Sequence, residues 1–481
     1  MRLANQAAVL TASRLANFTL LLLSPVMLVR LISVRQFGEY REFVLYASLL
    51  QSFAAFTIPD GLLYFIPKHP DSPWRVVRSS VALTAIASIA VVLGMIVLDF
   101  VMGGTLVGPF LLPLALYALF MVNLDFWEVF FIATRQTRLV VVYTAARLAS
   151  RMLVAVVSAW LSRDVTVIIW SLVWLEALRF GIAAVVWRRI DRGSGEPPVT
   201  DGLRDQWRFT ASTGIAMLLG LARRNLATIA VVKMLGAEAL ARYSIGKYGE
   251  PIVATLRTSL SSVVLPEMVR REGQAGDAVM TLWRRSTVMC ALLTFPIVPP
   301  VLRFAEPALG FVFGDAYRAA AVVMQIYMLV VIRECFDFSP ALRSIGRTAP
   351  IVYGTMAGLV VAAIAVWVLV PQIGIAGAMA AYAIGSIVEA VWLAVSLMRL
   401  RGIGITRLAD WGSIGKIVLA AALAALVLLP DFWERQMGVF GIALASGLFA
   451  AAYVAFAWIV RVPETTLLLR WIAARGKLSK T

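Results

Sequence analysis

The fold is decided by residues 349–398, which read APIVYGTMAGLVVAAIAVWVLV over 349–370 and, three residues later, GIAGAMAAYAIGSIVEAVWLAVSLM over 374–398. Each part is a run of about 20 or more mostly apolar residues, the length that an α-helix needs to cross roughly 30 Å of hydrocarbon. Glu389 is the one charged residue in the two runs. The stretch therefore predicts two successive transmembrane helices.

Similar apolar runs recur along the whole chain. The sequence has 481 residues, of which 61% are hydrophobic, whereas a soluble domain is usually about half apolar. We predict an all-α polytopic membrane protein with about fourteen transmembrane helices. They are expected near residues 8–32, 43–66, 76–98, 108–132, 139–162, 165–187, 208–233, 243–266, 286–305, 319–342, 349–370, 374–398, 413–430 and 438–460.

The longest polar segment, residues 188–207, contains Gly193, Gly195, Pro197 and Pro198 close together. This composition is typical of a linker. We predict a six-helix bundle over residues 1–187, a cytoplasmic linker over 188–207 and a second six-helix bundle over 208–398. Residues 399–481 are expected to add two further transmembrane helices and a basic cytoplasmic tail.

The two predicted bundles resemble each other in sequence. Residues 29–40 read VRLISVRQFGEY and residues 232–243 read VKMLGAEALARY, so that apolar, basic, small and Tyr positions coincide. Six helices per copy give both copies the same orientation in the membrane. We therefore expect two parallel repeats, with a binding site between them near the middle of the membrane.

The net charge of +17 is explained by the loops. With the N-terminus inside, about 26 Lys and Arg residues fall in cytoplasmic segments and about nine, Arg41 among them, fall in outside loops, as the positive-inside rule requires. The sequence therefore predicts that both termini are cytoplasmic. It gives no reason to expect a nucleic-acid partner.

Nine basic residues remain inside the predicted helices. An Arg or Lys at the centre of a bilayer costs at least about 2.5–3.5 kcal/mol, so these side chains must face water, a counter-ion or a substrate. Arg179 follows Glu176 by three positions on one helix face, and we expect this pair to be structural. The other eight are candidates for a cationic substrate-binding cavity: Arg14, Arg147, Arg151, Arg223, Arg224, Lys247, Arg257 and Arg333.

Acidic residues inside the predicted helices leave two interpretations open. Each could neutralise an arginine on a neighbouring helix, or one of them could bind a proton or a sodium ion that couples transport. Asp337 also lies four residues after Arg333, where a local pair could form. The candidates for ion coupling are Asp125, Glu128, Glu250 and Asp337. We expect no metal site and no cofactor, and the sequence has no phosphate-binding P-loop for ATP.

Three short motifs resemble the bacterial flippases that export polysaccharide precursors. They are FGEY at residues 37–40, FVFGDAY at 311–317 and IGIAGA at 373–378, each at the start of a predicted helix or just before one. These flippases belong to a superfamily that also contains the lipid II flippases and the multidrug and toxic compound extrusion transporters. The resemblance extends over nearly the whole chain.

The resemblance implies a transporter and not an enzyme. The family has two six-helix bundles, two extra C-terminal helices and alternating access around a cationic central cavity. Its substrate is a polyprenyl-diphosphate-linked oligosaccharide, and its place is the bacterial cytoplasmic membrane, where membrane lipids surround it. A polysaccharide polymerase and glycosyltransferases are candidate partners.

Two alternatives within the superfamily stay open, namely a flippase for the peptidoglycan precursor lipid II and a multidrug–cation antiporter. Relatives often carry an acidic residue midway along the seventh helix, where this chain has Arg223 and Arg224. This departure puts a cation-coupling role for that helix in doubt. An Arg-rich cavity also disfavours the cationic substrates of the antiporters.

Overall fold

The computed structural model describes residues 23–462, apart from 57, 69–72, 106, 125, 135, 195–199, 273–277 and 436. Every regular element in these ranges is a helix. The first predicted transmembrane helix lies largely outside the described residues, and so do Arg14 and Asp125. The all-α prediction is thus confirmed for the part of the chain that the structure describes.

Ten helical segments are long and apolar enough to cross a membrane. They match the predicted helices from the third onward, except the seventh, and one of them, Ala349–Arg401, holds two predicted helices. The second predicted helix is interrupted, because the backbone of Phe56 turns left-handed with a φ of 40°. The chain is therefore a polytopic membrane protein, as the sequence predicts.

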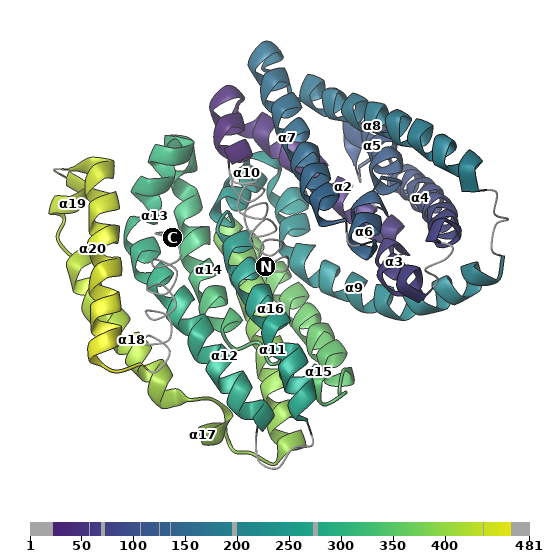
Figure 1. Cartoon of the computed structure of the whole chain (residues 1–481). Coiled ribbons are helices and arrows are strands. Elements are labelled where there is room, and N and C mark those ends of the chain that lie inside the picture. Colours follow the sequence, from purple (N-terminus) through teal and green to yellow (C-terminus); the bar gives the residue numbers. More distant parts are fainter. Residues whose placement is uncertain are drawn as a thin grey trace, which may run out of the picture. The chain divides into compact units, whose positions relative to one another are not determined.

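The chain divides into two compact units, Met1–Leu221 and Ala222–Thr481. In the first unit, α2 packs against α4, α5 and α8, while α7 packs against α6 and α8 (Figure 1). The helices of this unit are α2 (Val34–Ala55), α3 (Ile58–Lys68), α4 (Pro73–Val101), α5 (Leu111–Val122), α6 (Phe126–Ala133), α7 (Thr137–Ser162) and α8 (Val165–Ser194). The next helix, α9 (Thr200–Leu235), crosses the division, so helices enter the segment 188–207 from both ends.

Helix α2 begins earlier than the hydropathy pattern suggests. The Ser33 hydroxyl accepts a hydrogen bond from the backbone N–H of Gln36 at 3.2 Å, and the Gln36 side chain accepts one from the backbone N–H of Ser33 at 3.1 Å. This capping box starts the helix at Val34. Arg41 therefore lies inside α2 and not in a loop, while its expected place on the outer side stays a prediction.

The second unit is built around α14 and α16, which pack against each other, and around α11, which packs against α12 and α15. At its edge, α18 and α20 pack on each other and on α13 (Figure 1). Its helices are α10 (Ala237–Gly246), α11 (Glu250–Arg271), α12 (Ala278–Thr294), α13 (Val298–Phe313), α14 (Ala321–Glu334), α15 (Ser339–Ser344), α16 (Ala349–Arg401), α17 (Ile405–Leu408), α18 (Trp411–Ala425), α19 (Phe432–Arg435) and α20 (Gly438–Ile459).

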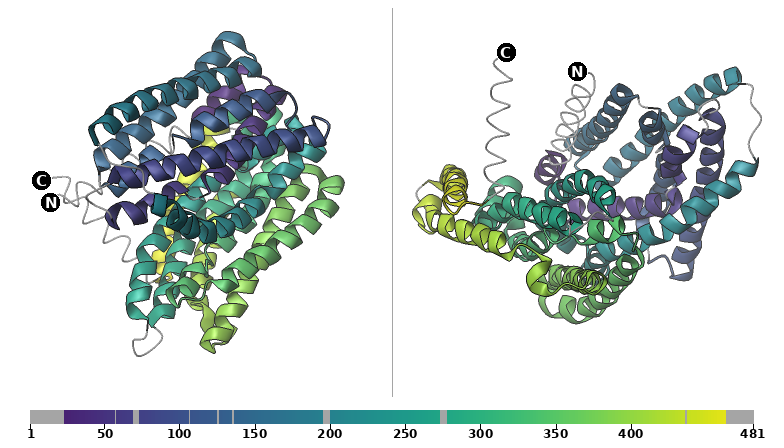
Figure 2. Two further views of the ribbon diagram at one scale, coloured as in Figure 1. Left: turned by 90° about the vertical axis from the view of Figure 1, so that its right-hand side faces the viewer. Right: turned by 60° about the horizontal axis from the view of Figure 1, so that its bottom comes forward.

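Helix α16 is a hairpin of two arms. The backbone leaves the helical region at Ile373 and at Gly374, whose φ of 59° suits glycine. The arms then run side by side (Figure 2) and meet at two glycines, since a Cβ at Gly358 would lie 2.6 Å from the carbonyl oxygen of Gly385. The prediction of two successive helices in residues 349–398 is confirmed.

Candidate functional site

A fully buried carboxylate in the first unit is held by two arginines. Glu176 on α8 is 0% exposed. Its Oε1 lies 2.6 Å from Nε of Arg151 on α7, and its Oε2 lies 2.6 Å from Nη1 of Arg179. The predicted pair of Glu176 and Arg179 is confirmed, and Arg151 joins it. One buried carboxylate is thus shared by two guanidinium groups.

A second ion pair links α7 to α6. Nη2 of Arg147 lies 2.6 Å from Oε2 of Glu128. The ring of Tyr143 lies beside this pair, with the guanidinium carbons of Arg147 and Arg179 5.9 and 5.8 Å from its centroid. Glu128 thus neutralises an arginine of a neighbouring helix, which is one of the two interpretations that the sequence leaves open.

A pocket of about 310 Å³ is lined by residues of α2, α5, α7 and α8. Its polar lining comes mainly from Arg41, Arg151, Tyr40 and Tyr117, and the rest is mostly apolar. The guanidinium of Arg151 lies 5.8 Å from the centroid of the Tyr117 ring. Nε of Arg41 is buried and has no hydrogen-bond acceptor among the described residues. The pocket therefore combines two guanidinium groups with two phenol rings.

Arg41 is not among the site residues predicted from the sequence. The signal that could have found it is the Ser33-x-x-Gln36 pattern, which is typical of a capping box and places Arg41 within the following helix. Hydropathy alone excludes Arg41 from a membrane helix because its neighbours Tyr40, Glu39 and Glu42 are polar. The cap, and not the apolar run, marks the start of α2.

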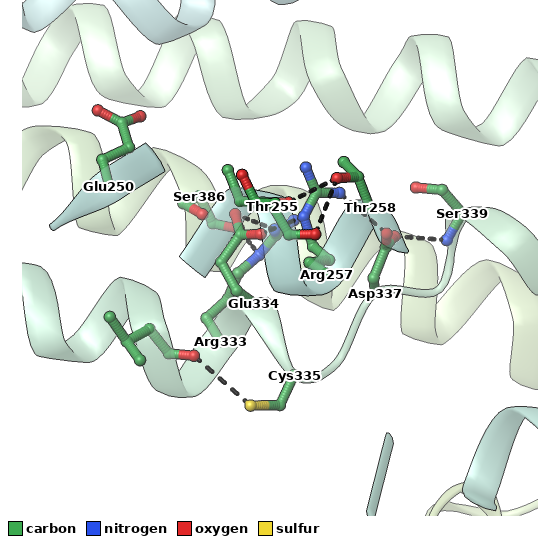
Figure 3. Close-up of polar contacts among 12 residues, drawn as sticks. Glu250, Thr255, Arg257, Thr258, Arg333, Glu334, Cys335, Asp337, Ser339 and Ser386 are labelled. Atoms are coloured by element: carbon green, nitrogen blue, oxygen red, sulfur yellow. Dashed lines mark hydrogen bonds and ion pairs between the residues drawn. The ribbon is translucent and has the colours of Figure 1, made fainter. Parts of the chain in front are cut away.

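The second unit holds a similar arrangement around Glu389 on α16. This carboxyl is buried, and its Oε2 lies 3.1 Å from Nη2 of Arg223 on α9 and 3.3 Å from Nη2 of Arg333 on α14. The hydroxyl of Thr355 donates a hydrogen bond to Oε1 at 2.8 Å. Nε of Arg333 donates to the carbonyl oxygen of Ser386 at 3.0 Å (Figure 3). As at Glu176, one carboxylate contacts two arginines.

Arg257 on α11 is paired with two acids. It contacts Glu334, and its Nη1 lies 3.0 Å from Oδ2 of Asp337 (Figure 3). Asp337 also accepts a hydrogen bond from the backbone N–H of Ser339 at 3.0 Å. The predicted local pair of Arg333 with Asp337 is wrong, because α14 ends at Glu334 and the two residues do not share a helix face.

Lys247 and Glu250 form a third polar cluster in this unit. Nζ of Lys247 lies 2.9 Å from Oε2 of Glu250 and 4.7 Å from the centroid of the Tyr382 ring. The phenol of Tyr382 donates a hydrogen bond to Glu250 at 3.4 Å. Lys247 caps the C-terminus of α10 and Glu250 begins α11, so a break between the helices brings the two charges together.

The structure thus groups the sequence candidates within each unit. Arg147 and Arg151 lie together with Glu128 in the first unit. In the second unit, Arg223 and Arg333 share Glu389, Arg257 pairs with Asp337, and Lys247 pairs with Glu250. Arg224 is exposed on α9, and within the described ranges no ion pair involves it. The convergence of Arg147, Arg151, Arg223 and Arg224 on one cavity stays a prediction.

A family model covers more than half of the chain. The model of the family described as "polysaccharide biosynthesis protein" matches residues 27–322. The chain belongs to this family. The family resemblance inferred from the three short motifs is therefore confirmed. No curated protein sequence matches the chain significantly.

Solved structures of the same fold are transporters of low sequence identity. The lipid II flippase MurJ in an inward closed conformation is 11% identical with a TM-score of 0.64, over 94% of this chain and 98% of that chain. An inward-facing MATE multidrug transporter of the MOP superfamily is 13% identical, with a TM-score of 0.53 over 82% and 96% of the chains. The eukaryotic MATE transporter AtDTX14 is 14% identical, with a TM-score of 0.52 over the same shares. This member of the polysaccharide biosynthesis family therefore has the MurJ and MATE fold.

Proposed function

We propose that the protein moves a polyprenyl-diphosphate-linked oligosaccharide across the bacterial cytoplasmic membrane by alternating access. The observation that supports this most is the pocket lined by Arg41, Arg151, Tyr40 and Tyr117. A diphosphate needs fixed positive charge in a place shielded from bulk water, and a glycan needs flat apolar faces beside polar groups. The pocket offers both.

The choice of arginine fits a diphosphate. A guanidinium stays charged and can hold two phosphate oxygens at once in a planar fork. Arg151 already makes one charge-assisted contact, from its Nε to Glu176 at 2.6 Å. Tyr117, which stands against the Arg151 guanidinium, offers an aromatic face of the kind on which sugars pack. An anionic head would therefore find its counter-charge in this pocket.

Two other substrates fit the same fold. Lipid II is also a diphosphate-linked sugar, and MurJ, which has this fold, is a lipid II flippase; the family match to polysaccharide biosynthesis favours a polysaccharide unit. Cationic drugs, the class expected for an antiporter, would meet repulsion from Arg41 and Arg151. A transport role and not an enzymatic one fits these features, with a polysaccharide polymerase and glycosyltransferases as its candidate partners.

Both termini are proposed to be cytoplasmic, from the distribution of Lys and Arg. A reporter enzyme that is active only outside the cytoplasm should give no signal when it is fused after Thr481. The same reporter inserted after Arg163, between α7 and α8, should be active, because this turn is expected outside. Reporter activity after Thr481, or no reporter activity after Arg163, would contradict the proposed orientation.

Replacement of Arg41 by Gln should slow transport about tenfold, since a charge-assisted hydrogen bond contributes about 1.5–3 kcal/mol. The measurement uses purified protein in liposomes and a fluorescent diphosphate-linked sugar, whose movement between leaflets is followed by quenching. Arg35→Gln is the matched control, because Arg35 is on the same helix with 76% of its side chain exposed and pairs with Glu39. Equal rates for the two variants would argue against a diphosphate site in this pocket.

A further inference from the structure

The contact of Arg223 with Glu389 leaves part of the arginine without a partner. Nη2 of Arg223 lies 3.1 Å from the carboxylate. Its Nε and Nη1 are buried, yet in the part of the chain that is described neither has a hydrogen-bond acceptor. Buried polar groups are nearly always hydrogen-bonded, because an unpaired one loses its water without compensation. These two donors therefore require an acceptor that the described residues do not supply.

The carboxylate is held in place by α16 itself. Thr355 on the first arm donates to Oε1 of Glu389 on the second arm. The close approach of the arms at Gly358 and Gly385 fixes this geometry, since a Cβ at Gly358 would also come within 3.2 Å of the Glu389 Cβ. Glu389 is thus fixed within the hairpin, while its arginine partners come from other helices.

The two arginines are anchored to different extents. Arg333 has further partners, because it donates to the Ser386 carbonyl oxygen at 3.0 Å and lies 3.4 Å from Glu334 (Figure 3). Arg223 contacts Glu389 through a single nitrogen. A ligand that offers several acceptor oxygens could satisfy Nε and Nη1 of Arg223 and replace the one contact to Glu389.

We propose that Arg223 and Arg333 form a diphosphate-binding subsite, and that Glu389 occupies it as an internal competitor while substrate is absent. This inference rests on the proposed function. The diphosphate oxygens displace the carboxylate from Arg223 and accept from its unpaired donors, and the carboxylate returns when the head leaves. Exchange of one anion for another keeps the arginines neutralised throughout, since a bare buried charge is strongly unfavourable. Neutral or cationic molecules cannot make this exchange.

The test measures the affinity of the purified full-length protein, in detergent, for inorganic pyrophosphate by calorimetry. Glu389→Gln removes the competing charge with little change in shape, so pyrophosphate should bind about tenfold or more tightly, within the usual range for coupled ligands. Glu267→Gln is the matched control. Glu267 also pairs with two arginines, Arg270 and Arg271, but at the exposed end of α11. Its replacement should leave the affinity unchanged.

Glu389→Asp covers the case in which the Gln variant does not fold. Aspartate keeps the charge but draws the carboxylate back from Arg223, so the affinity should rise by a smaller factor than with Gln. If a folded Glu389→Gln or Glu389→Asp variant binds pyrophosphate no more tightly than the wild type, Glu389 does not compete with the diphosphate. If neither the wild type nor any variant binds pyrophosphate, the proposed function fails instead. Tighter binding in the Glu389 variants alone would support the subsite.

Discussion

Replacement of Glu176 by Gln should destabilise the protein by about 3–5 kcal/mol, the usual cost of removing one partner from a buried ion pair. Glu176 is 0% exposed and lies 2.6 Å from both Arg151 and Arg179. Its loss leaves two guanidinium groups in a buried site without their carboxylate. Since folded proteins are stable by only about 5–15 kcal/mol, much of the variant should fail to fold. Yield of monodisperse protein in detergent and its thermal unfolding measure the loss.

Glu128→Gln provides the matched control. Glu128 pairs with Arg147 at the same distance of 2.6 Å, but 26% of its side chain is exposed, so water can replace the lost partner. We expect a much smaller loss of stability for this variant. If Glu176→Gln unfolded at the wild-type temperature, another anion would have to neutralise Arg151 and Arg179, or water would have to solvate them.

The fold was accessible from the sequence because its signal is local. A run such as residues 349–370 predicts a membrane helix without reference to any other part of the chain. The Gly374 turn between the arms of α16 could also be anticipated, since the two apolar runs are separated by only three residues. The start of α2 was missed because the signal is a pair of hydrogen bonds from Ser33 and Gln36, which hydropathy does not register.

The ion pairs could be predicted from the sequence only in part. The contact of Glu176 with Arg179 follows from their spacing on one helix, and it was predicted correctly. The contacts of Arg151 with Glu176 and of Arg223 with Glu389 join different helices. Such contacts depend on how helices pack, and sequence spacing holds no information on that.

The observed ion pairs differ from the single cationic cavity that the sequence predicts. The sequence offers eight basic residues as equivalent candidates for one cavity. In the described residues, Arg147 and Arg257 have acids of their own. Two arginines share one carboxylate at Glu176 and at Glu389, and Arg333 also lies 3.4 Å from Glu334. Glu176 is in the sixth predicted helix of the first bundle and Glu389 in the sixth of the second, in keeping with the predicted repeat.

Replacement of Arg151 by Ala should reduce transport of the diphosphate-linked sugar about a hundredfold, because a buried charge pair with a phosphate can contribute 2–5 kcal/mol. The protein should still fold, since Glu176 keeps Arg179 as a partner. Arg151→Lys should restore only part of the rate, because an ammonium group supplies a point charge and no planar fork. The liposome assay with the fluorescent substrate measures all three rates.

Arg138→Ala separates a role in the pocket from a general effect of charge. Arg138 is exposed near the start of α7, the same helix that bears Arg151, and its removal changes the net charge by the same amount. We expect the wild-type rate for this variant. Full recovery with Arg151→Lys would mean that charge alone is needed and that phosphate is not held in a fork. A wild-type rate for Arg151→Ala would contradict a role of this arginine in binding the diphosphate.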